Sequence, residues 1–140
     1  MSRVSIYLNF MGTTEEAFGF YARAFNSSVI SMQRFGDVAD PTLTDDDRTK
    51  ILHAELAILD GTVLMATDML ESKGHHVRIG NNTTINLEPD TLEEAQRLYA
   101  ALSEGSTEGV PLQEMFWGAW WGTCLDRYGI RWMFNVPSLN

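Results

Sequence analysis

The chain is poor in cysteine and in basic side chains. Its 140 residues include one cysteine, Cys124, so there is no internal disulfide and no thiolate metal cluster. Ten Lys and Arg residues stand against 19 Asp and Glu residues, which gives a net charge of -9. This charge argues against nucleic acid or an anionic membrane as a partner, because both require a basic surface.

Long apolar runs and targeting signals are also missing. No apolar run approaches 18 residues, and no basic segment followed by an apolar segment stands at the N-terminus. The hydrophobic content of 44% and the charged content of 21% are typical of a globular protein. A chain of this length most simply makes one domain. We therefore expect a cytoplasmic, single-domain protein.

Apolar periodicity predicts an α+β protein with two helices. Alternating or turn-bounded apolar segments indicate strands. The expected strands cover residues 4–10, 28–35, 51–59, 62–67 and 77–88, and three more follow within 113–136. Capping boxes at Thr13-Thr-Glu-Glu16 and Thr91-Leu-Glu-Glu94 open the helices, which end near Phe25 and Ser103.

Two polar segments are expected to be loops. Residues 36–50 contain Asp40-Pro41 and three consecutive aspartates, and they predict a long, acidic, mobile loop. Such a loop could be a lid or simply a disordered excursion. Residues 69–76 predict a connector that leaves His75 and His76 on the surface.

The sequence contains an internal repeat. Residues 13–22 (TTEEAFGFYA) and 91–100 (TLEEAQRLYA) are identical at six of ten positions. The turn glycines Gly61 and Gly129 match at an offset of 68, which pairs Met65 with Met133. Each half therefore predicts strand–helix–strand–strand–strand, and we expect one domain, 1–140, made of two repeats of about 1–68 and 77–138.

Each repeat should cover one face of its sheet with a helix, so the opposite face must meet a partner or enclose a cavity. Strand parity predicts which side chains lie on that opposite face. These are Tyr7, Asn9, Met65, Thr67, Thr84, Asn86, Met133 and Asn135. The comparison of the repeats also places Asn9 and Asn86 in equivalent positions if the first turn has one extra residue near Gly12.

The order and spacing of several motifs resemble the vicinal oxygen chelate superfamily, which includes glyoxalases, bleomycin-resistance proteins and dioxygenases. The motifs are Phe20-Tyr21, the closing Asp126-Arg-Tyr-Gly-Ile-Arg-Trp-Met133 and the paired βαβββ modules. Within the superfamily, the chain is similar to the PhnB-like branch. The segments that carry this similarity are Tyr7–Gly12, Glu16-Ala17, Leu64–Asp68 and Met115–Gly118.

The resemblance implies curved mixed sheets around a cup-shaped pocket, commonly in a homodimer. It also implies a metal site on the first and fourth strands of each module, near Tyr7, Met65, Thr84 and Met133. A closing glutamate of the family is replaced here by Met133, and thioethers suit Mg, Mn or Ni poorly. We therefore expect no metal or other cofactor. The branch carries a methyltransferase label, but the sequence has no glycine-rich strand-to-helix loop for S-adenosylmethionine.

Three side chains are candidates for acid–base chemistry. His53 and Glu55 are two residues apart on an expected strand, so they share a face. Together with Asp68 they could form an acid–base site or an alternative divalent-metal site. The simpler interpretation is a hydrogen-bonded histidine and a solvated or paired glutamate. For Cys124 we expect a small buried residue, since the sequence identifies no base that would make it a nucleophile.

Other side chains are candidates for ligand binding. Inward-facing amides need partners, which a polar ligand or bridging water can supply, and methionines and tryptophans form an adaptable apolar lining. Trp120 and Trp121 are adjacent on a strand and must point apart, and we assign Trp120 to the pocket or to a partner subunit. The predicted ligand-binding residues are Tyr7, Asn9, Met65, Asn86, Trp120, Met133 and Asn135.

These predictions support three functions. The first is a homodimeric protein that binds a flat or partly apolar small molecule without a metal. The second is an enzyme of the same superfamily, of the lyase, isomerase or dioxygenase type, that uses His53, Glu55 or Asp68 with or without a divalent metal. The third is an assembly protein whose aromatic residues serve only the dimer.

Overall fold

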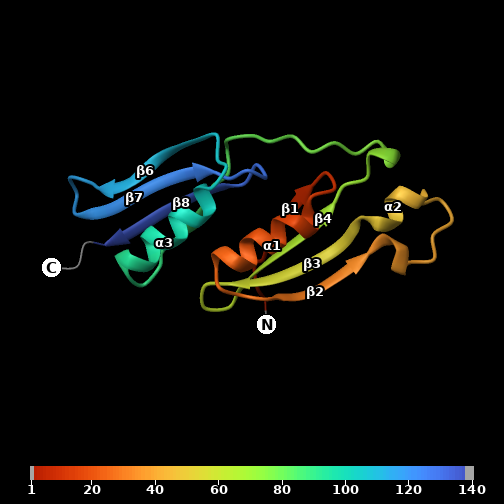
Figure 1. Cartoon of the computed structure of the whole chain (residues 1–140), viewed down its shortest axis with the longest axis horizontal. Coiled ribbons are helices and arrows are strands. Elements are labelled where there is room, and N and C mark those ends of the chain that lie inside the picture. The colour runs from red at the N-terminus through yellow and green to blue at the C-terminus, as the bar shows by residue number, and fades with distance from the viewer. Residues whose placement is uncertain (1, 138–140) are drawn as a thin grey trace. The chain divides into compact units, whose positions relative to one another are not determined.

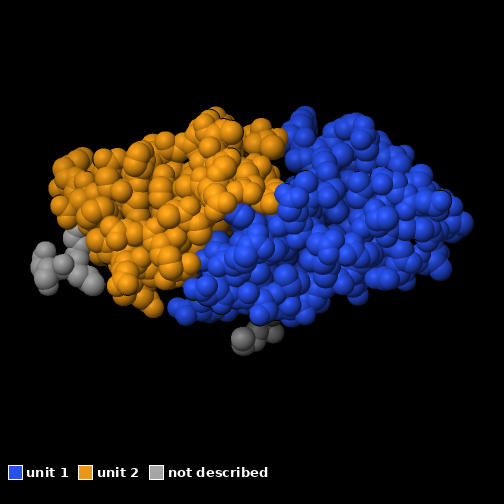
Figure 2. Space-filling model, in the orientation of Figure 1, with its two compact units in different colours: residues 1–78 blue, residues 79–140 orange. Residues whose placement is uncertain are grey.

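The computed structural model describes residues 2–137 of the chain, in two compact units, Met1–Arg78 and Ile79–Asn140 (Figure 2). Each unit contains one four-stranded sheet with one longer helix packed on it (Figure 1). Each unit also holds one of the two expected repeats. That the two together behave as one domain stays a prediction.

The first unit follows the predicted order of strand, helix and three strands. Its elements are β1 (Ile6–Phe10), α1 (Thr14–Ala24), β2 (Val29–Arg34), α2 (Asp45–Thr49), β3 (Ile51–Ile58) and β4 (Thr62–Asp68). The strands are ordered β1-β4-β3-β2, with β1 parallel to β4 and the other pairs antiparallel. The hairpin between β3 and β4 turns at Asp60-Gly61, as predicted.

The second unit repeats this topology. Its elements are β5 (Ile85–Leu87), α3 (Leu92–Ser103), β6 (Glu108–Glu114), β7 (Ala119–Leu125) and β8 (Arg131–Pro137). The strands are ordered β5-β8-β7-β6, again with one parallel pair, β5 and β8. The predicted α+β class, with two βαβββ modules and mixed sheets, is confirmed.

In the first unit, the core lies between α1 and one face of the sheet. Ala17, Phe18 and Tyr21 of α1 are fully buried, because helical spacing puts them on one side of the helix. They meet alternate residues of the strands, including Leu56 and Leu64, which are also fully buried. Burial of each such large side chain contributes roughly 1.5–3 kcal/mol to folding. The helix thereby fixes which face of the sheet is left open.

The second unit has an equivalent core around Trp132. This side chain is fully buried, and its indole Nε1 donates to Asp126 Oδ2 at 2.8 Å. Leu98 and Leu102 of α3 are buried against the same sheet, and Tyr99 meets Phe134 edge to face at 5.5 Å between ring centroids. Trp132 is therefore a core residue of this aromatic-rich segment.

Three local predictions were wrong. Residues 36–50 contain the short helix α2, which Thr44 caps by accepting from the Asp47 amide, while the Asp47 carboxylate accepts from Ser72 Oγ at 2.7 Å. The strand expected over 77–88 is confined to Ile85–Leu87. The following strand, β6, begins at Glu108, earlier than expected, and its edge position accommodates Pro111 at an irregularity.

None of the helices in the described part of the chain is long and apolar enough to cross a membrane.

Candidate functional site

The candidate site lies on the open face of the first sheet, which is the face opposite α1. Strand alternation puts Leu8, Leu64 and Leu56 under the helix, so their neighbours Tyr7, Met65 and Glu55 point to the other side. These three lie in one row across the sheet, because Tyr7 pairs with Met65 and Met65 pairs with Glu55. Ser31 of β2, which pairs with Glu55, completes the row.

A chain of polar contacts links the side chains of this face. The Tyr7 hydroxyl is hydrogen-bonded to His53 Nδ1 at 3.0 Å, and the two rings lie 5.7 Å apart at their centroids. The other ring nitrogen of His53, Nε2, is 3.8 Å from Glu55 Oε2. Ser31 Oγ donates to the same carboxylate oxygen at 3.3 Å. The four side chains will be called the open-face network.

The open-face network remains accessible. Tyr7 is 47% exposed as a residue, and about 30% of the His53 and Glu55 side chains is exposed. Partial burial raises the pKa of the Tyr7 hydroxyl above its ordinary value, and a hydrogen bond with Thr67 lowers it in part. The arrangement therefore presents a protonated phenol, an imidazole and a carboxylate to one region of solvent.

Asp68, the third predicted acid–base candidate, is not brought to this network. It is 3% exposed and lies on the helix-covered face at the end of β4. Its Oδ1 accepts from Gly12 N and from Thr14 N and Oγ1, and its Oδ2 accepts from Ile51 N. These bonds tie the start of α1 and the start of β3 to β4. Asp68 thus has a structural role in which both oxygens are occupied.

The predicted ligand-binding residues Asn9 and Met65 do share the open face with the network. Asn9 is exposed and pairs with Thr67, whereas Met65 lies between Tyr7 and Glu55 and is half-buried. Met65 can therefore supply an apolar contact in the middle of the polar groups.

The open face of the second sheet is less polar. Asn86, Met133, Thr123 and Val110 form the row that corresponds to Tyr7, Met65, Glu55 and Ser31. Asn135 lies on the same face and pairs with Trp121. A cavity of about 270 Å³ opens at one end of this face. Its lining includes Thr84, Val110, Thr123, Leu125 and Arg131.

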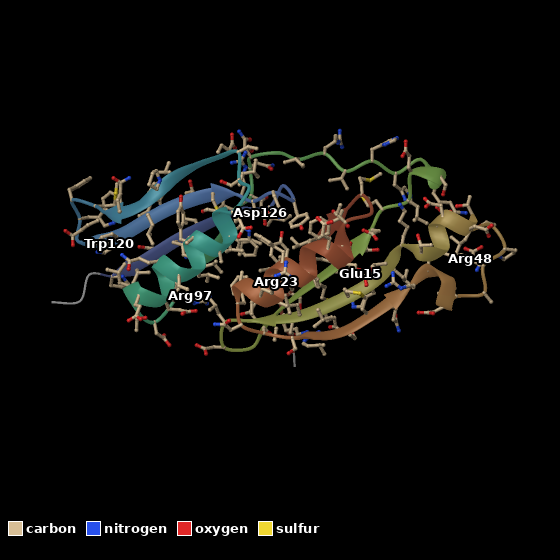
Figure 3. All side chains as sticks on the ribbon, in the orientation of Figure 1. Glu15, Arg23, Arg48, Arg97, Trp120 and Asp126 are labelled. Atoms are coloured by element: carbon tan, nitrogen blue, oxygen red, sulfur yellow. The ribbon has the colours of Figure 1, made fainter. Side chains whose placement is uncertain are left out.

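Two placements in the second sheet differ from the predictions. Trp120, labelled in Figure 3, pairs with Val136 and so lies on the helix-covered side, while Trp121 is the tryptophan on the open face. Asn86, opposite Met133, is equivalent to Tyr7, opposite Met65, rather than to Asn9. The extra residue near Gly12 lies between β1 and α1. It aligns Asn86 with Tyr7, whereas the expected alignment was with Asn9, so β1 is shifted in the direction opposite to the one expected.

The side chains at the family's metal positions do not fit a divalent metal. In the first unit these positions hold Tyr7 and Met65, and in the second they hold Asn86, in place of the expected Thr84, and Met133. A phenol and two thioethers are poor ligands for Mg, Mn or Ni, and the Asn86 amide supplies only one suitable oxygen. Among the described residues, moreover, no three His, Cys, Asp or Glu side chains are grouped to hold a metal ion.

Comparison with known proteins places this fold and these motifs in a family. The model of a family described as 3-demethylubiquinone-9 3-methyltransferase matches residues 2–134. The chain belongs to this family. Protein YjdN of Escherichia coli (strain K12) is 25% identical over 142 residues, covering 95% of this chain and 94% of that protein. The PhnB-like resemblance is thereby confirmed.

Solved structures agree with this assignment. Protein PA1353 from Pseudomonas aeruginosa has a TM-score of 0.86 and 33% identity, covering 99% of this chain and 100% of that chain. A putative 3-demethylubiquinone-9 3-methyltransferase, PhnB protein, from Bacillus cereus has a TM-score of 0.79 and 21% identity, covering 96% and 99%. A glyoxylase/bleomycin resistance protein/dioxygenase domain from Frankia sp. EAN1pec shows the shared fold. Its TM-score is 0.66 and its identity is 13%, covering 98% of this chain and 93% of that chain.

The activity in the family's description calls for a methyl donor, and the strand-to-helix junctions of this chain do not fit one. Such cofactors are commonly held by backbone amides of a glycine-rich loop at a helix N-terminus. After β1, the amides of Gly12 and Thr14 are bonded to Asp68. After β5, Thr91 Oγ1 accepts from the Glu94 amide of α3. The first junction contains one glycine, Gly12, and the second contains none, so neither is a glycine-rich loop.

Sequence parity brought His53 and Glu55 together, but it missed the contact from Tyr7. Tyr7 and His53 belong to strands separated by β4, so their contact depends on strand order. Ser31 and Trp121 were also missed as members of the open faces. Hairpin register could have placed Trp121, since it pairs with the predicted Asn135.

Proposed function

We propose that this protein binds a small, partly apolar molecule on the open faces of its sheets, without a metal. The observation that carries the proposal is the open-face network, in which Tyr7, His53 and Glu55 surround Met65 while remaining accessible. A hydrogen-bonding cluster beside a flexible apolar side chain is typical of a small-molecule site. The side chains at the family's metal positions, Tyr7, Met65, Asn86 and Met133, support binding without a metal.

The ligand should carry a hydrogen-bonding group beside a flat apolar part. Tyr7 and His53 would bind the polar group, and Met65 would contact the apolar part. In the second unit, Asn86, Met133, Trp121 and Asn135 offer an amide-rich and apolar surface, and the neighbouring cavity supports a role for that face as well. The sequence candidate Trp120 has no place in this proposal.

Binding can be tested by NMR titration with a panel of flat aromatic ketones, phenols and phosphonates. A ligand of the proposed class should shift the His53 ring and Met65 methyl signals and leave His76, in the exposed connector, unchanged. Tyr7→Phe should weaken binding about fivefold to tenfold, because one hydrogen bond is worth roughly 1 kcal/mol. Binding that is equal in the wild type, Tyr7→Phe and Met65→Ala would contradict the site.

We also propose that the chain forms a homodimer, which the family resemblance implies. Exposed aromatic residues at the turn between β6 and β7 support an interface: Phe116 is 95% and Trp117 is 53% exposed. Large exposed apolar side chains side by side often mark interaction surfaces. Light scattering coupled to size exclusion should give twice the 15.8 kDa chain mass. A monomer at micromolar concentration would contradict the dimer.

A further inference from the structure

We propose that Tyr7, His53 and Glu55 form a proton relay in which Tyr7 is the group that exchanges a proton with a bound substrate. The relay rests on the proposed binding face and adds a reaction to it. It gives Tyr7, rather than either histidine nitrogen, the direct contact with the reacting atoms. Among the described residues of β1–β4, His53 is the only histidine and Glu55 is the only carboxylate on the open face.

The relay requires a particular placement of the protons on Tyr7 and His53. Either group can donate in the 3.0 Å hydrogen bond between the Tyr7 hydroxyl and His53 Nδ1, and the relay assigns the donor role to the phenol. The remaining proton of the neutral ring then lies on Nε2, the nitrogen 3.8 Å from the Glu55 carboxylate. Each group therefore faces the partner that its part in a relay requires.

Charge on the open face favours the same assignment. The basic side chain within the described strands β1–β4 is Arg34, and it donates to Glu15 of α1 at 2.8 Å. Asn9 and Gln33 are neutral, and Glu55 has no cation partner other than His53 among the described residues. A positive charge that forms on the imidazole is thus stabilised by Glu55, which Ser31 holds in place.

The step balances without a metal or a redox partner. A substrate carbon next to a carbonyl group releases a proton to the Tyr7 oxygen, and the electron pair of that C–H bond forms the enolate. At the same time the original O–H bond of Tyr7 breaks, and its proton forms a bond to His53 Nδ1. The reverse sequence returns a proton to the enolate. As in hydrolase triads, a histidine takes the proton of a hydroxyl group and a carboxylate stabilises the imidazolium, but here the hydroxyl oxygen takes up a proton and does not attack carbon.

Two other groups of residues in the chain do not form such a relay. In the second unit, the positions equivalent to Tyr7, His53 and Glu55 hold Asn86, Trp121 and Thr123, which cannot pass a proton to one another. The buried carboxylates Asp47, Asp68 and Asp126 all accept from backbone amides, and Asp47 also accepts from Ser72 and Asp126 from the Trp132 indole. The first open face is therefore the one at which the relay is expected.

The relay can be tested with indan-2-one, a flat ketone whose benzylic protons exchange for deuterium when a base removes them. In D₂O, the wild-type protein should accelerate this exchange by about 100-fold over the same concentration of free imidazole, within the usual range for a positioned base. Tyr7→Phe and His53→Gln should abolish the acceleration. Glu55→Gln should reduce it about tenfold, and the control His76→Gln should leave it unchanged.

A second measurement separates the relay from binding and from a merely structural role. Nitrogen-15 NMR of the histidine ring should show the proton of neutral His53 on Nε2, and Tyr7→Phe should shift it toward a mixture of tautomers. A proton on Nδ1 in the wild type, or full exchange activity in Tyr7→Phe, would overturn the relay. Absence of acceleration in the wild type would also overturn it. Titration with the unreactive indan-2-ol decides the binding proposal independently.

Discussion

The reactivity of Cys124 is determined by its buried surroundings. It is 2% exposed on the helix-covered face of the second sheet, as predicted for a small apolar residue. Burial raises the pKa of its thiol to about 11, while a hydrogen bond with Ser103 lowers it in part and the Asp126 carboxylate raises it. Because the thiolate is the reactive form, Cys124 should be inert to thiol reagents at neutral pH.

The raised pKa of Cys124 predicts a loss of stability in alkali. The unfolded thiol ionises near pH 9 and the folded thiol near pH 11, so its contribution to stability is complete below about pH 9 and falls as the pH rises to about 11. Cys124→Ala should flatten this fall in the denaturation midpoint between pH 9 and pH 11. Parallel losses in the two proteins would contradict the assignment. Tyr7→Phe provides a comparison for the tyrosines that also titrate there.

At the scale of elements, the two repeated helices begin in different ways. In α3, Thr91 Oγ1 accepts from the Glu94 amide at 3.1 Å, as its capping box predicts. In α1, the equivalent Thr13 makes no side-chain cap, because the Asp68 carboxylate bonds to the Gly12 and Thr14 amides. Similar sequences thus cap one helix locally and the other through a distant strand.

This difference predicts unequal effects of two matched substitutions. Thr91→Ala should destabilise the protein by about 1 kcal/mol, the usual cost of losing an N-cap. Thr13→Ala should cost less than about 0.5 kcal/mol, because no cap is lost. Urea denaturation followed by circular dichroism measures both. Equal losses would show that Thr13 caps its helix in solution.

At the scale of the whole molecule, the two units carry different optical probes. All four tryptophans belong to the second unit, whereas Asp68 and its four hydrogen bonds belong to the first. A unit of 60–80 residues is marginally stable alone. We therefore expect the two units to unfold as one cooperative domain, in keeping with the single domain predicted from the sequence.

Asp68→Asn tests this cooperativity. Loss of the charged acceptor and a clash between two donors at Ile51 N should cost roughly 3 kcal/mol. Under cooperative unfolding, tryptophan fluorescence and far-UV circular dichroism shift to the same lower midpoint. A fluorescence transition that stays in place while the circular dichroism splits would show independent units. Asp46→Asn, at a side chain 80% exposed, is the control and should change little.

The sequence alone determined the repeated βαβββ order, both longer helices, the hairpin at Asp60-Gly61 and the shared face of His53 and Glu55. These features are local, because they follow from periodicity, cap residues and turn residues within a few positions. The family resemblance supplied the mixed sheets. Local patterns could not limit β5 to Ile85–Leu87 or find α2, because both depend on contacts with distant segments.

Only the tertiary structure decided which residues form the candidate site. Strand order brings Tyr7 across β4 to His53, and hydrogen bonds from three backbone amides in two separate segments remove Asp68 from the acid–base candidates. Register puts Trp121, not Trp120, on the open face. Strand alternation shows that adjacent side chains point to opposite faces of the sheet. Which of the two faces is open depends on where the helix packs, and contacts between residues far apart in the chain determine this.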